Sequence, residues 1–500
     1  MAKRKRNPAP NGNATREETP SKKAKVPNVS QPASPVTIQI VTGSYDRVLH
    51  GMTATILSED KVEFADTFLF NAHGSAIRCL ALSPPSAPEP GKIQKVMLAS
   101  GSSDERINVY HISAHPPKRK EKDMLSAIAP RKILENPKNR EIGTLLHHSS
   151  TVTALAFPTK SKLISASEDS SIAVTRTRDW SLLSTIKVPK PKPQGRPSGD
   201  TAALDGTPAG VNDFAVHPSM KLMISVSKGE RSMRLWNLMT ARKAGVLNFG
   251  RDILQEAGES KHSPGEGRKV VWGATEEGDE FCVGFDRDII VFGMDSTPKC
   301  RVMPEPRRKI HQFCYLSVDS TTDASLLAVS TEDGKIMFFS TKTDDLSSST
   351  DSSKTDNSKS GKLPVAKLVA QLGGKDAGIT GRIKDFSICT ATSDVDGSED
   401  LFISTGSSDG RIRLFKLNMA DLTAERPAGW STTNVVGKLL GTCDTQNRIT
   451  CMSAFKMIPR PEGVEDSDGE FDEDEDEEDD SSDEDEKEED DDDDDDDDEK

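Results

Sequence analysis

The sequence predicts an all-β fold: a closed ring of seven four-stranded blades, a β-propeller, between a basic N-terminal arm and an acidic C-terminal tail. Three observations predict it. Val, Ile and Leu occur in short bursts between turn residues, and aromatic residues make up only 5% of the chain. One turn motif recurs seven times. A segment near the C-terminus supplies a strand that the first copy of the motif lacks.

Charge divides the 500-residue chain into three regions, with the arm at 1–35, the propeller at 36–460 and the tail at 461–500. Residues 465–500 hold 29 Asp or Glu and two Lys, a net charge of −27; the whole chain carries −16, so residues 1–464 carry +11. Such a tail cannot bury apolar surface and is expected to be disordered. A basic body with an acidic tail indicates a polyanionic setting such as nucleic acid or ribosomal particles. Alternatively, the tail only keeps the protein soluble.

The arm carries two clusters of basic residues with a polar spacer between them. They are Lys3, Arg4, Lys5 and Arg6, and then Lys22, Lys23 and Lys25. This arrangement predicts a nuclear localisation signal. The arm could also contact RNA phosphates, and the two uses can coexist. No apolar run approaches the roughly 20 residues that cross a bilayer, and no signal-peptide core is present, so we expect a protein of the cell interior.

The repeated unit is an apolar strand, a tight turn with an acid, and an alternating strand. The seven acids are Asp46, Asp104, Asp169, Glu230, Asp286, Asp333 and Asp409. Five of them are followed six residues later by an aromatic residue: Tyr110, Trp236, Phe292, Phe339 and Phe415. A hydroxyl residue usually lies four residues before the acid, as in Ser100 and Ser165.

A further short strand precedes several copies, at 77–82 and 152–157 for example, with a histidine four residues before it. These histidines are His73 and His148. The combination of histidine, hydroxyl, turn acid and aromatic resembles the WD40 repeat, in which these side chains form a hydrogen-bonded network that links one blade to the next. The resemblance implies one complete network and matching members in other copies: His73, Ser100, Asp104 and Tyr110, then His148, Ser165, Asp169, Trp236, Asp286, Asp333 and Asp409.

These groupings are interpreted as structural, because they recur at the spacing of the repeat. A catalytic His-Ser-Asp reading is disfavoured for that reason. His147 and His148 could suggest a metal, but no carboxylate or thiol ligand lies at a fixed spacing nearby. No Walker loop, His-Glu-x-x-His or nucleotide-fold glycine pattern is present, so the sequence predicts no enzyme and no cofactor.

Closure of the ring follows from the edges of the blades. A four-stranded blade has free edges and cannot bury both faces alone, whereas radial stacking in a closed ring solves both problems. The first copy lacks an opening strand, and the segment at 448–456 resembles one. We therefore expect the two ends of the propeller to share one blade.

Long insertions separate the strands and carry most of the basic loop residues. In 113–141 and 187–197, the candidate RNA or partner contacts are Lys118, Arg119, Lys120, Arg131, Lys132, Lys190 and Lys192. The strand order places insertions 113–141, 341–362 and 416–433 on one face, and 187–209 and 250–267 on the other. In the tail, Ser467, Ser481 and Ser482 have an acid three residues on, which suits an acid-directed kinase.

Particular stretches are more specific than WD40 repeats in general. They lie at 43–51, 147–153, 163–169, 180–187, 216–222, 234–238, 382–385 and 407–410. Together they resemble the maintenance-of-killer WD-repeat proteins of fungi and their animal counterparts, the PAK-interacting proteins. The resemblance implies a nucleolar factor for 60S ribosomal subunit assembly and rRNA processing, with no catalytic residues.

The partners implied by this resemblance are the pre-60S particle with its assembly factors, and possible further ones are basic ribosomal-type proteins and precursor rRNA. Membranes and small-molecule substrates are not expected. The alternative is an adaptor that binds and restrains a p21-activated kinase, as the animal relatives do. The charge layout favours the ribosomal role, because a cytoplasmic adaptor needs no import signal.

Overall fold

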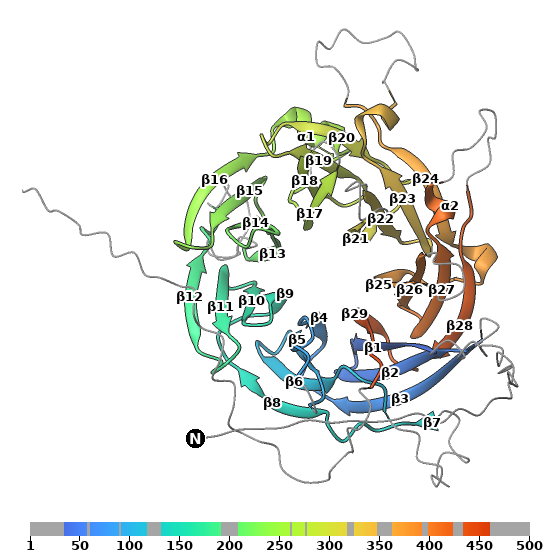
Figure 1. Ribbon diagram of the computed structural model, residues 1–500. Helices are drawn as coiled ribbons and strands as arrows, with labels where there is room; N and C mark the ends of the chain where they lie inside the picture. Colours follow the sequence, from blue (N-terminus) through green and yellow to red (C-terminus); the bar gives the residue numbers. More distant parts are fainter. Residues whose placement is uncertain are drawn as a thin grey trace, which may run out of the picture. The chain divides into compact units, whose positions relative to one another are not determined.

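The computed structural model describes residues 35–57, 61–89, 92–117, 132–191, 209–260, 263–275, 278–317, 325–347, 363–392, 399–423 and 434–460. This part of the chain forms seven antiparallel sheets arranged as blades around a common axis (Figure 1). The seven-bladed propeller predicted from the sequence is confirmed.

Each blade contains four strands that follow one another from the axis outward. Blade 1 holds β29 (Ile449–Lys456), β1 (Val36–Ser44), β2 (Val48–Ile56) and β3 (Val62–Asn71), with β7 (Lys132–Ile133) added parallel to β3. Blade 2 holds β4 (Ile77–Leu82), β5 (Lys95–Ser102), β6 (Ile107–Ser113) and β8 (Arg140–Leu145). Blade 3 holds β9 (Val152–Thr159), β10 (Lys162–Ser167), β11 (Ser171–Arg176) and β12 (Leu182–Lys187).

The other four blades follow in chain order. Blade 4 holds β13 (Val211–Val216), β14 (Leu222–Ser227), β15 (Ser232–Asn237) and β16 (Arg242–Asn248). Blade 5 holds β17 (Lys269–Thr275), β18 (Gly278–Gly284), β19 (Ile289–Gly293) and β20 (Pro298–Val302). Blade 6 holds β21 (Ile310–Ser317), β22 (Ser325–Thr331), β23 (Lys335–Ser340) and β24 (Lys367–Gly373). Blade 7 holds β25 (Ile383–Thr392), β26 (Glu399–Ser407), β27 (Arg411–Asn418) and β28 (Lys438–Asp444).

The short helices lie in connections between strands. They are α1 (Arg251–Glu256), α2 (Ala420–Thr423) and the 3₁₀ turns η2 (Thr343–Asp345) and η3 (Lys375–Ala377).

The hydrophobic core lies between adjacent blades. The middle strands are buried on both sides, as in β22, where all residues are buried, whereas the outer strand β16 has five exposed residues. Phe338 of blade 6 and Phe415 of blade 7, for example, belong to one buried cluster. The middle strands are therefore covered on both faces, whereas the innermost strands, such as β9, and the outer strands keep partly exposed residues.

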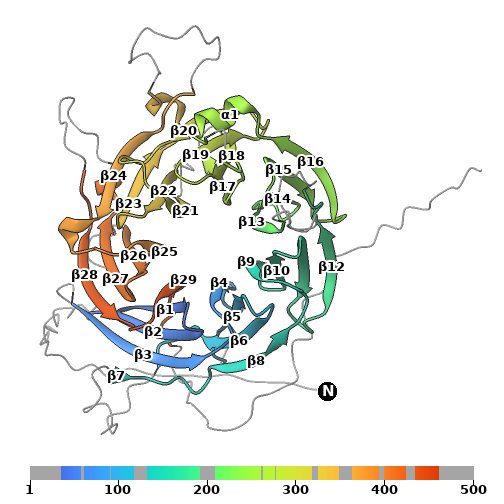
Figure 2. The same ribbon diagram turned by 180° about the vertical axis from the view of Figure 1, so that it is seen from behind.

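Blade 1 joins the two ends of the propeller. Strand β29 pairs antiparallel with β1, with Ile40 opposite Ala454, and the two strands lie side by side in Figures 1 and 2. β1 thus has a hydrogen-bonded neighbour on each side, β29 and β2. The innermost strand of blade 1 is thus formed by Ile449–Lys456 from the C-terminal end of the propeller.

The two faces of the ring differ in their connections. All seven motif acids lie in the turns between the second and third strands of successive blades. Because adjacent strands run in opposite directions, these turns share one face with the connections from each outer strand to the next inner strand; we call it the turn face. On the opposite face, which we call the insert face, lie the strand ends that three of the insertions join, β6 to β8, β23 to β24 and β27 to β28. The strand ends that the other two join, β12 to β13 and β16 to β17, lie on the turn face, in agreement with the predicted placement.

Candidate functional site

The complete motif copy forms a compact network in blade 2. His73 follows β3, and its Nε2 lies 2.8 Å from Ser100 Oγ, while its Nδ1 lies 3.2 Å from the carboxylate of Asp104. The backbone N–H of Gly74 donates to the same carboxylate at 2.8 Å. Tyr110 is buried and packs edge-on against Phe70, with ring centroids 5.6 Å apart. The network ties the entry of the inner strand to the turn between β5 and β6.

Burial and hydrogen bonds set the protonation of this network. Burial lowers the pKa of His73, against the opposing effect of Asp104, so the imidazole is neutral near pH 7. Burial acts to raise the pKa of Asp104, but the N–H of Gly74 and the imidazole outweigh it and lower that pKa. Burial also raises the pKa of Tyr110 to about 12. The Asp104 carboxylate accepts hydrogen bonds, and the His73 imidazole connects Ser100 to Asp104. Both residues therefore have a structural role.

Blade 3 repeats the arrangement without an aromatic residue. His148 Nε2 lies 2.8 Å from Ser165 Oγ, and its Nδ1 lies 3.1 Å from Asp169. Ser171 donates its backbone N–H and its hydroxyl to Asp169. Since both nitrogens of His148 contact protein groups, the imidazole acts as a strand link here.

Two blades replace the imidazole with a guanidinium, which sequence reasoning missed. In blade 7, the buried Arg413 donates to Asp409 at 3.2 Å and to Ser407 Oγ at 3.0 Å. In blade 4, Arg234 forms a paired contact with Glu230, with 2.8 Å between Nη2 and Oε1. Both arginines stand four residues after the turn acid, so an i to i+4 acid–arginine spacing was the available signal.

The remaining motif residues have separate partners. Trp236 Nε1 donates to Ser225 Oγ at 2.8 Å in blade 4. Asp286 in blade 5 forms ion pairs with Arg268 at 3.1 Å and with Lys309 at 3.5 Å. Asp333 in blade 6 accepts the hydroxyl of Thr331. Each turn acid is therefore stabilised locally, but by different chemistry from blade to blade.

Most of the predicted arm, loop and tail residues lie outside the described residues. These are Lys3, Arg4, Lys5, Arg6, Lys22, Lys23, Lys25, Lys118, Arg119, Lys120, Arg131, Lys192, Ser467, Ser481 and Ser482. Of the other two candidate contacts, Lys190 is exposed, and Lys132 in β7 donates to Glu63 of β3. Lys132 thus helps to hold β7 against blade 1.

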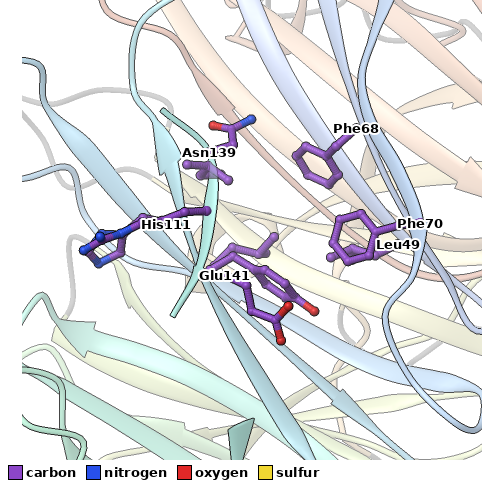
Figure 3. Close-up of a pocket in the computed structure, with 10 residues that line it drawn as sticks. Leu49, Phe68, Phe70, His111, Asn139 and Glu141 are labelled. Carbon is purple, nitrogen blue, oxygen red and sulfur yellow. The ribbon is translucent and has the colours of Figure 1, made fainter. Parts of the chain in front are cut away.

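A pocket of about 260 Å³ lies between blades 1 and 2 (Figure 3). Leu49, Phe68, Phe70 and Tyr110 form its apolar part, and Glu141 lies among its polar lining. Its volume is below the range of about 300–1,000 Å³ that is usual for small-molecule sites. It is therefore too small to serve as a substrate pocket of ordinary size.

Comparison with known proteins agrees with this architecture. The WD40 family, described as "WD domain, G-beta repeat", matches residues 139–174, which span β8 to part of β11. Protein MAK11 of Saccharomyces cerevisiae is 26% identical over 416 residues, 78% of this chain and 80% of that protein. The p21-activated protein kinase-interacting protein 1-like proteins of Danio rerio and Xenopus laevis are 24% and 23% identical, over 84% and 86% of this chain and 80% and 84% of theirs. The chain is a WD40-repeat homologue of these proteins. The similarity to MAK11 extends far beyond the single matched repeat.

A WD40 propeller is typically a non-catalytic scaffold, and none of these relatives is named for an enzymatic activity. Within the described ranges, no group of three or more His, Cys, Asp or Glu side chains is placed to hold a metal ion. No helix in the same ranges is long and apolar enough to span a membrane.

Proposed function

We propose that this protein is a non-catalytic WD40 scaffold in the nucleolar assembly of the 60S ribosomal subunit and in rRNA processing. The observation that carries the proposal is the similarity to MAK11 over 78% of the chain, since the resemblance found in the sequence implies this role. The charge layout supports it: residues 1–464 carry +11 and residues 465–500 carry −27. Basic loops gain by counterion release on rRNA, and an acidic tail suits Lys- and Arg-rich ribosomal proteins.

The test is a pull-down of the tagged full chain from nuclear extract at moderate salt. Mass spectrometry of the bound proteins and probing for precursor rRNA should find 60S-assembly factors together with large-subunit precursor. The association should weaken as salt is raised, because phosphate contacts release counterions. Absence of the protein from nucleoli and from pre-60S gradient fractions would reject the proposal.

The second candidate is an adaptor that binds a p21-activated protein kinase. The favouring observation is that the relatives from Danio rerio and Xenopus laevis are named for interaction with such a kinase. Mixing the purified chain with the kinase should then produce a complex and slow phosphorylation of a standard substrate. A kinase that neither binds nor slows would remove this candidate without affecting the ribosomal one.

A further inference from the structure

Basic residues occupy the same position in several successive blades. The residue directly before the inner strand is basic in four consecutive blades, from blade 5 through blade 7 to blade 1: Arg268, Lys309, Arg382 and Arg448. In the other three blades it is Ala76, Thr151 or Gly210. The carbonyls of Lys309, Arg382 and Arg448 accept turn N–H groups at 3.0, 2.9 and 2.8 Å, which fixes these residues at the inner edge of the turn face. Figure 1 shows β17, β21, β25 and β29 as the innermost strands of these blades.

The next positions of the inner strands carry a second pattern. In six blades the pairing between the innermost and the second strand shifts register near the second residue of the innermost strand, which forms a β-bulge. The residues at this position are Arg78, Thr153, Asn212, His311, Lys384 and Thr450. Three of these residues link their blade to the next. Thr153 donates to Val211 O at 2.8 Å, Asn212 to Gly267 O at 2.8 Å, and Thr450 to Ile77 O at 2.6 Å.

Blades 6 and 7 place His311 and Lys384 at this linking position without such a bond. The Nε2 of His311 is buried and has no hydrogen-bond partner. Lys384 is half-buried and makes no hydrogen bond or ion pair with any residue that the structure describes. Within the described part of the chain, blades 6 and 7 therefore lack the link to the next blade that the equivalent residues form in blades 1, 3 and 4.

The acids nearby do not balance these cations. Asp286 is shared by Arg268, Arg287 and Lys309, and Glu332 lies 2.8 Å from Arg382. Asp46 accepts the backbone N–H of Arg448, whose guanidinium lies 5.6 Å from the ring of Tyr45.

Among the described residues, neither Lys384 nor the guanidinium of Arg448 has a carboxylate within ion-pair distance. Burial lowers the pKa of Lys384, and repulsion from Arg382, Arg448 and Lys309 lowers it further, against the opposing effect of Glu332, so these charges are close neighbours. The arrangement has the charge and the donors of an anion site.

We propose that Arg268, Lys309, Arg382, Lys384 and Arg448, which we call the rim cluster, bind phosphate groups of single-stranded RNA. Guanidinium groups match phosphate oxygens with two donors, and cations spread over four blades suit an anion that repeats along a chain. Tyr45 is 59% exposed beside Arg448 and offers a ring for a base to stack on, which an acidic peptide would not use. This site adds an RNA contact to the proposed function. It rests on that function only for which RNA is bound.

The experiment measures binding of a fluorescent 12-nucleotide uridine RNA to the purified full chain by anisotropy over a range of salt. The double variant Lys384→Gln and Arg448→Gln should bind about tenfold more weakly. Its slope of log affinity against log salt should fall by about 1.4, since each phosphate contact on a single strand contributes about 0.7. Tyr45→Leu should weaken binding severalfold and leave the slope unchanged.

The matched control is Lys221→Gln with Arg242→Gln, two exposed cations at the insert-face ends of strands in blade 4. This control should bind RNA as the wild type does. All variants should have the melting temperature of the wild type. Equal weakening in the control and the rim variant would overturn the site as non-specific. Displacement of the RNA by poly-glutamate at equal charge, with no effect of Tyr45→Leu, would assign the cluster to acidic peptides instead. A protein that enters pre-60S fractions but fails to bind this RNA would reject the rim cluster alone.

Discussion

At the scale of single residues, the turn acid is the constant feature and its partner is the variable one. Asp104 and Asp169 face an imidazole, whereas Glu230 and Asp409 face an arginine on the same hairpin. In each case the carboxylate is satisfied and fixes the turn. The acids and the aromatic positions could be predicted from the sequence because their spacing repeats. The arginines could not be predicted in the same way, because an arginine follows the acid at this spacing in only two copies, Arg234 and Arg413.

Substituting Asp104 by Ala should destabilise the propeller by about 1–3 kcal/mol. The change leaves the N–H of Gly74 and Nδ1 of the buried His73 without their acceptor. Thermal unfolding followed by circular dichroism should show the loss. Asp179→Ala is the matched control, because Asp179, like Asp104, accepts the backbone N–H two residues on but is half exposed, and its removal should change stability little. Equal melting temperatures for the two variants would contradict the structural role of the network.

His311 predicts a pH dependence of stability. Burial lowers its pKa to about 4, with Lys384, Lys309 and Arg382 adding to the effect and Asp286 opposing it. Between pH 6.5 and about 4 the unfolded chain binds a proton that the folded chain does not, so stability falls as pH is lowered through this range. His311→Gln should flatten this part of the profile by on the order of 2 kcal/mol in urea unfolding. An unchanged slope would show that the pKa of His311 is the same in the folded and the unfolded chain.

At the scale of elements, the blades depend on close approach where one sheet meets the next. Gly101 in β5 faces β9 of blade 3: an added Cβ would lie 2.7 Å from Val152 Cγ1 and 2.8 Å from Cys79 Sγ. Gly43 in β1 meets Ile77 of blade 2 in the same way, at 2.6 Å. Small residues at these points let the inner strands of adjacent blades pack together.

Gly101→Ala should therefore cost about 1–3 kcal/mol, as for other overpacked core positions. The control is Gly143→Ala in β8 of the same blade, where an added Cβ has no atom within 4 Å. Urea unfolding of the two variants should separate them. If Gly143→Ala is as destabilising as Gly101→Ala, the loss reflects strand propensity in general and not contact between blades.

Strand β29 predicts a sharp difference between two truncations. A chain that ends at residue 445 loses β29, whose Ile449, Cys451 and Met452 are buried, and leaves the inner edge of β1 unpaired. A chain that ends at residue 460 keeps the whole ring. We expect the shorter chain to aggregate or unfold, because an open edge and a missing strand both act against it. The longer chain should keep the melting temperature of the full protein. Gel filtration and thermal unfolding measure both, and a monomeric, folded chain ending at 445 would contradict closure by β29.

At the scale of the whole molecule, the features that repeat along the chain could be predicted from the sequence, and those that do not repeat could not. The seven blades and the closing segment follow from a recurring pattern, so the fold was accessible from the sequence. The rim cluster was not, because Arg268, Lys309, Arg382 and Arg448 are far apart in the chain and meet only when the ring brings four inner strands together. RNA contact was instead predicted for the basic insertions, where charge is dense along the chain. Basic residues that are dense along the chain can be recognised in one sequence. Basic residues that come together only in the folded ring cannot.

Charge at the N-terminus should decide where the molecule works. Replacing the seven basic residues of the two clusters at 3–6 and 22–25 by Gln should move a fluorescently tagged protein from nucleolus to cytoplasm, because import receptors read clustered positive charge. The matched control replaces Lys118, Arg119, Lys120 and Arg131 in an insertion, which should leave import intact. Adding an unrelated import signal to the arm variant separates entry from retention. Full recovery in the nucleolus means that the arm serves import and that the rest of the chain holds the protein there. Recovery in the nucleus without nucleolar enrichment means that the arm also contacts the particle, and an arm variant that still reaches the nucleolus unaided would reject the signal.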